Sequence, residues 1–118
     1  MNNTNHCRFV NPRVERNRSL NDALRTSLVG GRVMFTRGVA ALGAEAQRQI
    51  IEALRRYDDF DADNDPYGEH DFGMIKVQGH EFLFKIDYYD RDLAYHSTDA
   101  ADPSVTTRVL TIMFAEEY

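Results

Sequence analysis

Apolar positions along the chain repeat first at helical spacing and later at strand spacing. In residues 19–28 they recur every three or four residues, and Ser19 and Asp22 have the spacing of a capping box. Gly30-Gly31 follows as a stop signal, so this segment predicts a short helix of about ten residues. Residues 32–36 are β-branched and aromatic and predict a strand.

Residues 43–57 predict an amphipathic helix. Apolar side chains form one stripe along it, and charged side chains mark the opposite face. The stripe comprises Ala46, Ile50, Ile51, Leu54 and Tyr57.

The clearest local prediction is a β-hairpin. Residues 72–77 and 80–89 have strand composition and flank Gln78-Gly79, which suits a two-residue turn. If Val77 lies opposite His80, the large apolar side chains of both strands fall on one face, which we expect to be the core side.

Residues 106–114 are β-branched or apolar on both faces, as expected for a central strand. A helix capped by Asp102, with Pro103 at its first position, is the alternative for this segment. The elements together predict an α+β fold, with an antiparallel sheet of about four strands and two helices packed on one face.

Length and composition fit one globular domain. The chain has 118 residues, 42% of them hydrophobic, which is enough for a single core. Residues 1–18 are polar and lack periodicity, so we expect a flexible basic arm followed by one domain over residues 19–118. The lone Cys7 excludes a disulfide framework, and no apolar run is long enough to cross a membrane. We therefore expect a soluble, cytoplasmic protein.

Charge is distributed unevenly along the chain. The net charge is −5, yet residues 1–56 carry ten Arg against four acidic residues, and residues 57–118 carry four basic against fifteen acidic residues. The two parts either attract one another in the fold or leave separate basic and acidic regions. The Arg-rich part also allows a small DNA-binding regulator as an alternative.

The densest charge lies in residues 58–71, where half of the fourteen residues are carboxylates and none is Lys or Arg. The acidic residues are Asp58, Asp59, Asp61, Asp63, Asp65, Glu69 and Asp71. A helix precedes this run and a strand follows it, so we expect a surface loop that binds a cation, faces a basic partner or stays solvated.

Part of this run resembles a calcium-binding loop. Asp61, Asp63 and Asp65 match the first three ligand positions, but Pro66 stands where Gly is required and Phe72 where Glu is required. The run is therefore no EF-hand. The three aspartates stay an alternative site for a divalent metal, and we expect no cofactor.

His70 is the candidate for acid–base chemistry. Extending the hairpin register places it opposite Asp87, with Glu69 close by. A carboxylate orients a catalytic or metal-binding imidazole in this way, but the same pair can simply close the open end of a hairpin. No nucleophile or second metal-ligand motif accompanies the pair. We therefore favour a non-enzymatic protein and keep His70, Asp87 and Glu69 as the catalytic alternative.

A second candidate contact surface follows the hairpin. It combines aromatic and acidic side chains, namely Tyr88, Tyr89, Asp90 and Asp92. The carboxylates would repel phosphates, so direct binding to nucleic acid is not expected. The same side chains suit a protein with a basic surface, such as one that binds DNA or RNA.

Several short stretches resemble a known family. They are residues 36–39 (TRGV), 64–66 (NDP), 68–73 (GEHDFG), 85–90 (KIDYYD), 107–113 (TRVLTIM) and 117–118 (EY). Over about residues 20–118 the chain resembles small uncharacterised proteobacterial proteins, common on plasmids and other mobile elements, that are known only as a domain of unknown function. The resemblance implies no catalytic residue. It does imply a mobile-element setting that also holds inhibitors of host defence, such as anti-CRISPR and antirestriction factors.

These features predict a small non-enzymatic protein-binding module with an acidic surface. We expect its partner to be a basic protein surface, and a nucleic-acid-binding effector of host defence is the most concrete form of that partner. The alternatives are an enzyme that depends on His70 and a DNA-binding regulator that uses the Arg-rich N-terminal part.

Overall fold

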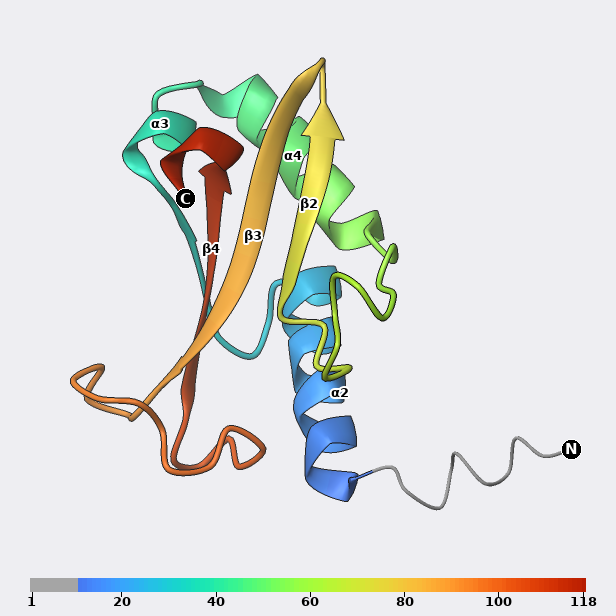
Figure 1. Cartoon of the computed structure of the whole chain (residues 1–118). Coiled ribbons are helices and arrows are strands. Elements are labelled where there is room, and N and C mark those ends of the chain that lie inside the picture. Colours follow the sequence, from blue (N-terminus) through green and yellow to red (C-terminus); the bar gives the residue numbers. More distant parts are fainter. Residues whose placement is uncertain (1–10) are drawn as a thin grey trace, which may run out of the picture.

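A four-stranded sheet forms the centre of the structure, a computed structural model that describes residues 11–118 (Figure 1). Its strands are β1 (Arg32–Phe35), β2 (Phe72–Val77), β3 (His80–Tyr89) and β4 (Thr107–Phe114), in the order β1-β4-β3-β2. β3 is antiparallel to β2 and β4, whereas β1 is parallel to β4. The prediction of an entirely antiparallel sheet is therefore wrong at β1. Its partner lies at the far end of the chain, and local patterning does not fix the direction of so distant a pairing.

The helices are α2 (Pro12–Ser27), α3 (Arg37–Ala40) and α4 (Ala44–Arg56), and the 3-10 turn η1 (Ala115–Glu117) follows β4. Two main helices were predicted, and α3 is a further short one. Among residues 11–118 no helix is both long and apolar enough to cross a bilayer.

α2 begins seven residues earlier than predicted. Asn11 caps it by accepting a hydrogen bond from the Arg13 amide at 2.8 Å, and Pro12 occupies the first turn. Residues 12–18, expected to belong to the arm, are thus the first turns of a helix. They lack apolar periodicity because this end of α2 buries the polar Asn17 instead of an apolar side chain. Residues 1–10, the rest of the predicted arm, lie outside the described residues.

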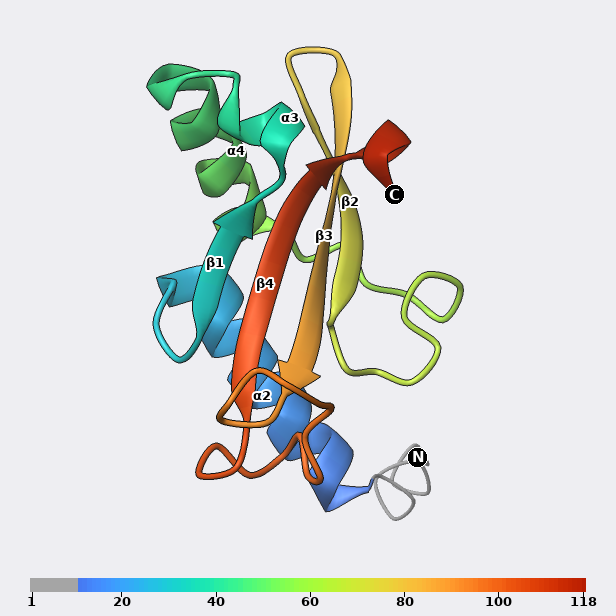
Figure 2. The same ribbon diagram turned by 90° about the vertical axis from the view of Figure 1, so that its left-hand side faces the viewer.

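α2 and α4 lie on the same side of the sheet (Figures 1 and 2). Leu24 of α2 and Ile50 and Leu54 of α4 are almost fully buried against Phe84 and Leu110 of the two central strands. The amphipathic helix predicted for residues 43–57 is confirmed as α4, with its apolar stripe in the core.

The predicted hairpin is confirmed residue by residue. Val77 lies opposite His80, and Phe72 opposite Lys85 at the other end of the ladder. Gln78 and Gly79 both have positive φ, 55° and 81°, as a type I′ turn requires. The segment after Asp102 forms the central strand β4, so the alternative of a helix there is wrong.

The C-terminal turn is fastened to the start of α3 by the carboxylate of Glu117. This carboxylate accepts hydrogen bonds from the Thr36 hydroxyl at 2.7 Å, the Gly38 amide at 3.1 Å and the Phe114 amide at 2.7 Å. A Cβ atom on Gly38 would lie 2.7 Å from a Glu117 oxygen, so a larger residue at this position would require the Glu117 carboxylate to shift.

Candidate functional site

The acidic loop, residues 58–71, joins α4 to β2. Its carboxylates fall into two groups. Asp58, Asp59 and Asp63 are exposed, and none of them forms an ion pair with another of the described residues. We call these three the rim carboxylates. The others bind groups of the protein itself.

Asp61 and Asp65 shape the loop. The Asp61 carboxylate accepts hydrogen bonds from the amides of Asp63 and Asn64, both at 2.9 Å. Asp65 is 9% exposed, and its carboxylate accepts from the amides of Glu69 at 3.1 Å and His70 at 3.2 Å. These are local turns in which a side-chain oxygen satisfies backbone donors.

The same geometry argues against the alternative metal site. The Asp61 carboxylate binds the amides of Asp63 and Asn64, the Asp63 side chain is exposed and Asp65 is buried, so the three carboxylates do not converge. No group of three or more His, Cys, Asp or Glu within residues 11–118 is placed to hold a metal ion.

His70 fastens the acidic loop to α2. Its Nδ1 lies 2.8 Å from Asp22 Oδ1 and its Nε2 lies 3.6 Å from Asp65 Oδ2. Its ring stacks on Phe60, with centroids 3.9 Å apart and planes 4° from parallel. The guanidinium of Arg25 lies 5.1 Å from the same Phe60 ring and pairs with Asp22 at 2.8 Å.

The predicted pairing of His70 with Asp87 is wrong. His70 has a φ of 57°, and this left-handed residue takes the chain out of the hairpin, whose ladder ends at Phe72. Asp87 instead binds the Lys85 ammonium at 2.5 Å. The catalytic alternative therefore loses Asp87 as the orienting residue, and the carboxylate beside His70 is that of Asp22 instead.

A second polar group lies beneath α2. We call it the buried polar cluster; it comprises Asn17, Asn21, Glu69, Asp71, Tyr88 and Arg108. Arg108 of β4 is 2% exposed and lies within 5.3 Å of the Tyr88 ring centre. Its Nε donates to Asn21 Oδ1 at 2.9 Å, and its Nη2 donates to Asn17 Oδ1 and to the Ala100 carbonyl.

Tyr88 links this guanidinium to the acidic loop. Its hydroxyl accepts hydrogen bonds from the side-chain amides of Asn21 at 2.8 Å and Asn17 at 3.1 Å, and donates to Asp71 Oδ2 at 3.1 Å. Asn17 also donates to Glu69 Oε2 at 3.2 Å. Tyr88, predicted to contact a partner, thus points into the molecule.

Burial changes the acid–base properties of the cluster. It raises the pKa of the Glu69 carboxyl, and the nearby charge of Asp71 adds to that increase. Burial also raises the pKa of the Asp71 carboxyl, against the lowering effect of the Tyr88 hydrogen bond. The pKa of the Tyr88 hydroxyl is raised and that of the Arg108 guanidinium lowered, again chiefly by burial.

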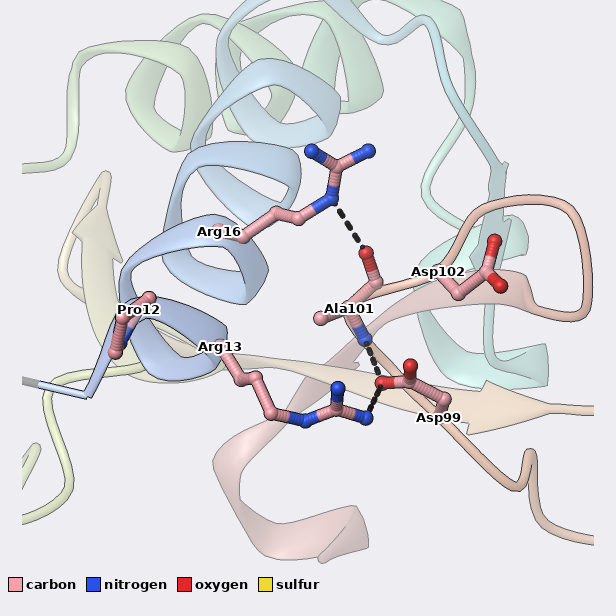
Figure 3. A pocket seen from close by; sticks show the side chains of 6 residues that line it. All are labelled: Pro12, Arg13, Arg16, Asp99, Ala101 and Asp102. Atoms are coloured by element: carbon pink, nitrogen blue, oxygen red, sulfur yellow. Dashed lines mark hydrogen bonds and ion pairs between the residues drawn. The ribbon is translucent and has the colours of Figure 1, made fainter.

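Two hollows lie beside this cluster, between α2 and the loop that follows β3. One, of about 220 Å³, is lined by Asn17, Glu69 and Asp99 among others. The other, of about 350 Å³, is shown in Figure 3. There Arg13 pairs with Asp99 at 2.6 Å and Arg16 Nε donates to the Ala101 carbonyl at 2.8 Å. These two arginines of the DNA-binding alternative therefore engage the protein itself.

The second predicted contact surface is only partly available. Tyr89 is half-buried, and the Asp90 carboxylate accepts a hydrogen bond from the Ala94 amide at 2.9 Å. Asp92 is exposed. The rim carboxylates are therefore the more accessible of the two predicted surfaces.

Sequence reasoning missed the polar core of the cluster. Asn17, Asn21 and Arg108 were not among the predicted site residues. The available signal was Arg108, the one charged residue in a segment otherwise suited to a buried strand. A charge at such a position needs polar partners from a neighbouring element, and α2 supplies them.

The model of a protein family described as "Protein of unknown function (DUF3768)" matches residues 35–117. The chain belongs to this family. The match contains the acidic loop, Tyr88, Arg108 and Glu117, whereas α2 precedes it. Comparison with curated proteins and with solved structures gives no match.

Proposed function

We propose that this DUF3768 protein is a binding protein that engages a basic protein surface through its rim carboxylates. The observation that carries the proposal is that some side chains of the acidic loop hold its conformation while others are left exposed. Asp61, Asp65 and His70 fix the loop, while Asp58, Asp59 and Asp63 stay exposed without ion pairs among the described residues. A loop ordered in this way loses little conformational entropy when it binds.

Charge on a larger scale supports the same surface. Residues 57–118 carry fifteen acidic residues against four basic ones. Within residues 11–118, only the Arg13–Asp99 ion pair and the contact of His70 with the Asp22 carboxylate join the charged side chains of this acidic part to those of the earlier basic part. The remaining negative charge would attract a basic partner and speed its association.

The chemistry of such a partner points to a protein that itself binds nucleic acid. These proteins carry surfaces rich in Lys and Arg that are built to meet phosphates, and closely spaced carboxylates can occupy them. A mobile-element origin would make a nuclease or other effector of host defence the most concrete partner. A partner of this kind also predicts that DNA or RNA competes with this protein for the same basic surface.

The enzymatic alternative keeps one supporting observation, a raised pKa of Glu69 beside a cavity of about 220 Å³. The other two residues of that alternative, His70 and Asp87, make separate contacts elsewhere. The binding function is therefore better supported.

The test is affinity capture from lysate at low salt. The binding variant is Asp58→Asn/Asp59→Asn/Asp63→Asn, which leaves the loop-forming Asp61 and Asp65 intact. The control is Glu45→Gln/Glu52→Gln/Glu116→Gln, which removes the same formal charge from exposed positions outside the loop. We expect the wild type and the control to retain one partner that the binding variant loses, and nucleic acid to release it. Equal capture by all three proteins would contradict the proposal.

A further inference from the structure

A hollow lined by arginines lies where β4 begins. It has a volume of about 370 Å³ and is bounded by α2, the turn between α2 and β1, the first residues of β4 and the loop that joins β3 to β4. Its lining includes Arg32, Arg91 and Arg108, and none of the lining residues is acidic. Four other hollows among residues 11–118 each have Asp or Glu in their lining. Although the net charge of the chain is −5, this hollow therefore suits an anion.

The charge of Arg108 forms no ion pair with a carboxylate of the described residues. Its guanidinium is almost fully buried and donates to neutral oxygens, those of the Asn17 and Asn21 side chains and the Ala100 carbonyl. Hydrogen bonds of Asn17 and Tyr88 connect it indirectly to the carboxylates of the buried polar cluster. Buried charges are usually paired, so an anion in the hollow would supply the missing counter-charge.

The turn between α2 and β1 places Arg32 beside the start of β4. A Cβ atom on Gly31 would lie 2.6 Å from the backbone carbonyl oxygen of Arg108, so the turn approaches β4 more closely than a residue with a side chain allows. Arg32 follows this glycine and lies opposite Val109 in the strand register. It is exposed and forms no ion pair with another of the described residues. Its guanidinium is therefore available to a ligand.

Arg91 lines the same hollow from the loop after β3. It is exposed, and its Nη1 donates to the Pro103 carbonyl at 3.3 Å, which is long for such a hydrogen bond and uses one of the five N–H donors of the guanidinium. Within residues 11–118 it forms no ion pair. Several positive charges in one hollow repel each other, and an anion between them removes that repulsion.

We propose that this hollow binds a phosphate group, either as the free ion or on a small phosphorylated molecule. Arg32 and Arg91 donate to the phosphate oxygens, because the planar guanidinium matches the geometry of phosphate. The volume lies within the range of small-molecule sites, about 300–1,000 Å³. Leu20 and Pro103 add apolar groups to the lining, against which the organic part of a phosphorylated ligand can pack.

A small anion fits this site better than a nucleic acid does. Asp92 and Asp102 adjoin the lining residues Arg91 and Pro103 in the chain. A nucleic acid carries its phosphates beyond the hollow, where these carboxylates repel them. A single phosphate group does not extend that far.

Isothermal titration calorimetry of the full chain at about 50 mM salt tests the proposal. The probes are inorganic phosphate, adenosine monophosphate, adenosine and a short single-stranded DNA. We expect inorganic phosphate to bind at one site per chain and adenosine not to bind. Tighter binding of adenosine monophosphate than of phosphate would identify a phosphorylated molecule as the ligand, and weaker or equal binding would identify the free ion.

Two variants connect the binding to the hollow. We expect Arg32→Gln and Arg91→Gln each to weaken phosphate binding at least tenfold, because each removes charge-assisted hydrogen bonds. Arg37→Gln is the matched control, since Arg37 is an exposed arginine of α3 outside the hollow. The proposal is overturned if the wild type binds no phosphate at millimolar concentration, if all three variants bind it as the wild type does, or if DNA binds at least a hundredfold more tightly through the same arginines.

Amide chemical shifts of the full chain locate the anion independently of the variants. On addition of phosphate, we expect the largest changes at Gly30, Gly31 and Arg91. Arg55 and Arg56 at the end of α4 are a second pair of neighbouring arginines and serve as the comparison. Changes confined to that end of α4 would place the anion outside the hollow and overturn the proposal.

Discussion

At the scale of single residues, Arg108 is the charge around which the polar groups beneath α2 are arranged. A guanidinium under a helix is costly unless its donors are satisfied, and Asn17, Asn21 and the Ala100 carbonyl accept them. The side-chain amides of these two asparagines in turn donate hydrogen bonds, from Asn21 to the Tyr88 hydroxyl and from Asn17 to the Glu69 carboxylate. The hydrogen-bonding groups that anchor the acidic loop to the core thus satisfy one another in a single network.

Removal of one asparagine should therefore cost more than the loss of one hydrogen bond. We expect Asn21→Ala to lower the free energy of unfolding by about 2–4 kcal/mol, because it leaves Arg108 and Tyr88 short of partners in a buried site. Urea denaturation measures the change, with the exposed Ser19→Ala on the same helix as control. Combining Asn21→Ala with Arg108→Met should cost less than the sum of the two single changes, and strict additivity would contradict a shared network.

The half-buried carboxyls of Glu69 and Asp71 predict how stability depends on pH. Folding raises the pKa of Glu69 and Asp71, so their contribution to stability is present below the ordinary pKa of carboxylic acids, about 4, and is lost as pH rises through their folded-state values. Glu69→Gln/Asp71→Asn keeps the acceptor oxygens and removes the charges.

This double variant should therefore gain stability relative to the wild type as the pH rises from about 4 to about 7. Thermal unfolding monitored by circular dichroism across that range is the measurement. Parallel pH profiles for the two proteins would show that these carboxyls do not carry the effect.

At the scale of elements, the acidic loop behaves as a fixed element although it contains neither helix nor strand. His70 fastens it to α2 from between Asp22 and Asp65 and stacks on Phe60. Arg18 and Asn21 of α2 add hydrogen bonds to the carbonyls of Gly68 and Glu69, at 2.9 Å and 3.0 Å. Helix α2 thus serves two elements, since it also supplies Asn17 and Asn21 to Tyr88 of β3.

Loss of the His70 ring should loosen the loop selectively. We expect His70→Ala to accelerate amide hydrogen exchange in residues 58–71 at least several-fold, while the amides of β4 keep their protection. His96→Ala, at an exposed loop position, should leave the acidic loop unchanged. Hydrogen exchange measured by mass spectrometry distinguishes these outcomes, and a uniform increase over the whole chain would instead indicate global destabilisation.

Elements that are determined by the residue pattern within one segment could be predicted from the sequence. Elements that depend on a partner far along the chain could not. The hairpin register follows from alternation around Gln78-Gly79, and α4 from its apolar stripe, because each pattern lies within one short segment. The parallel pairing of β1 with β4 and the early start of α2 depend on distant partners. For the same reason the pairing of His70 with Asp22 was missed, since the left-handed His70 leaves the ladder that sequence extrapolation continues.

At the scale of the whole molecule, the proposal requires that the uneven charge along the chain also be an uneven charge on the surface of the fold. The arginines of α2 engage carbonyls and acidic groups nearby, as Arg13, Arg16 and Arg18 do. Among the described residues, none of them forms an ion pair with a rim carboxylate. This arrangement leaves the rim carboxylates as the surface that we propose for a basic partner.

The central claim is that the rim carboxylates bind a basic partner, and its most direct test is a titration of the captured partner at about 50 mM and about 300 mM salt. We predict at least a tenfold loss of affinity at the higher salt, and a similar loss at low salt for Asp58→Asn/Asp59→Asn/Asp63→Asn. An affinity that changes neither with salt nor with these three substitutions would contradict the proposed role of the rim carboxylates.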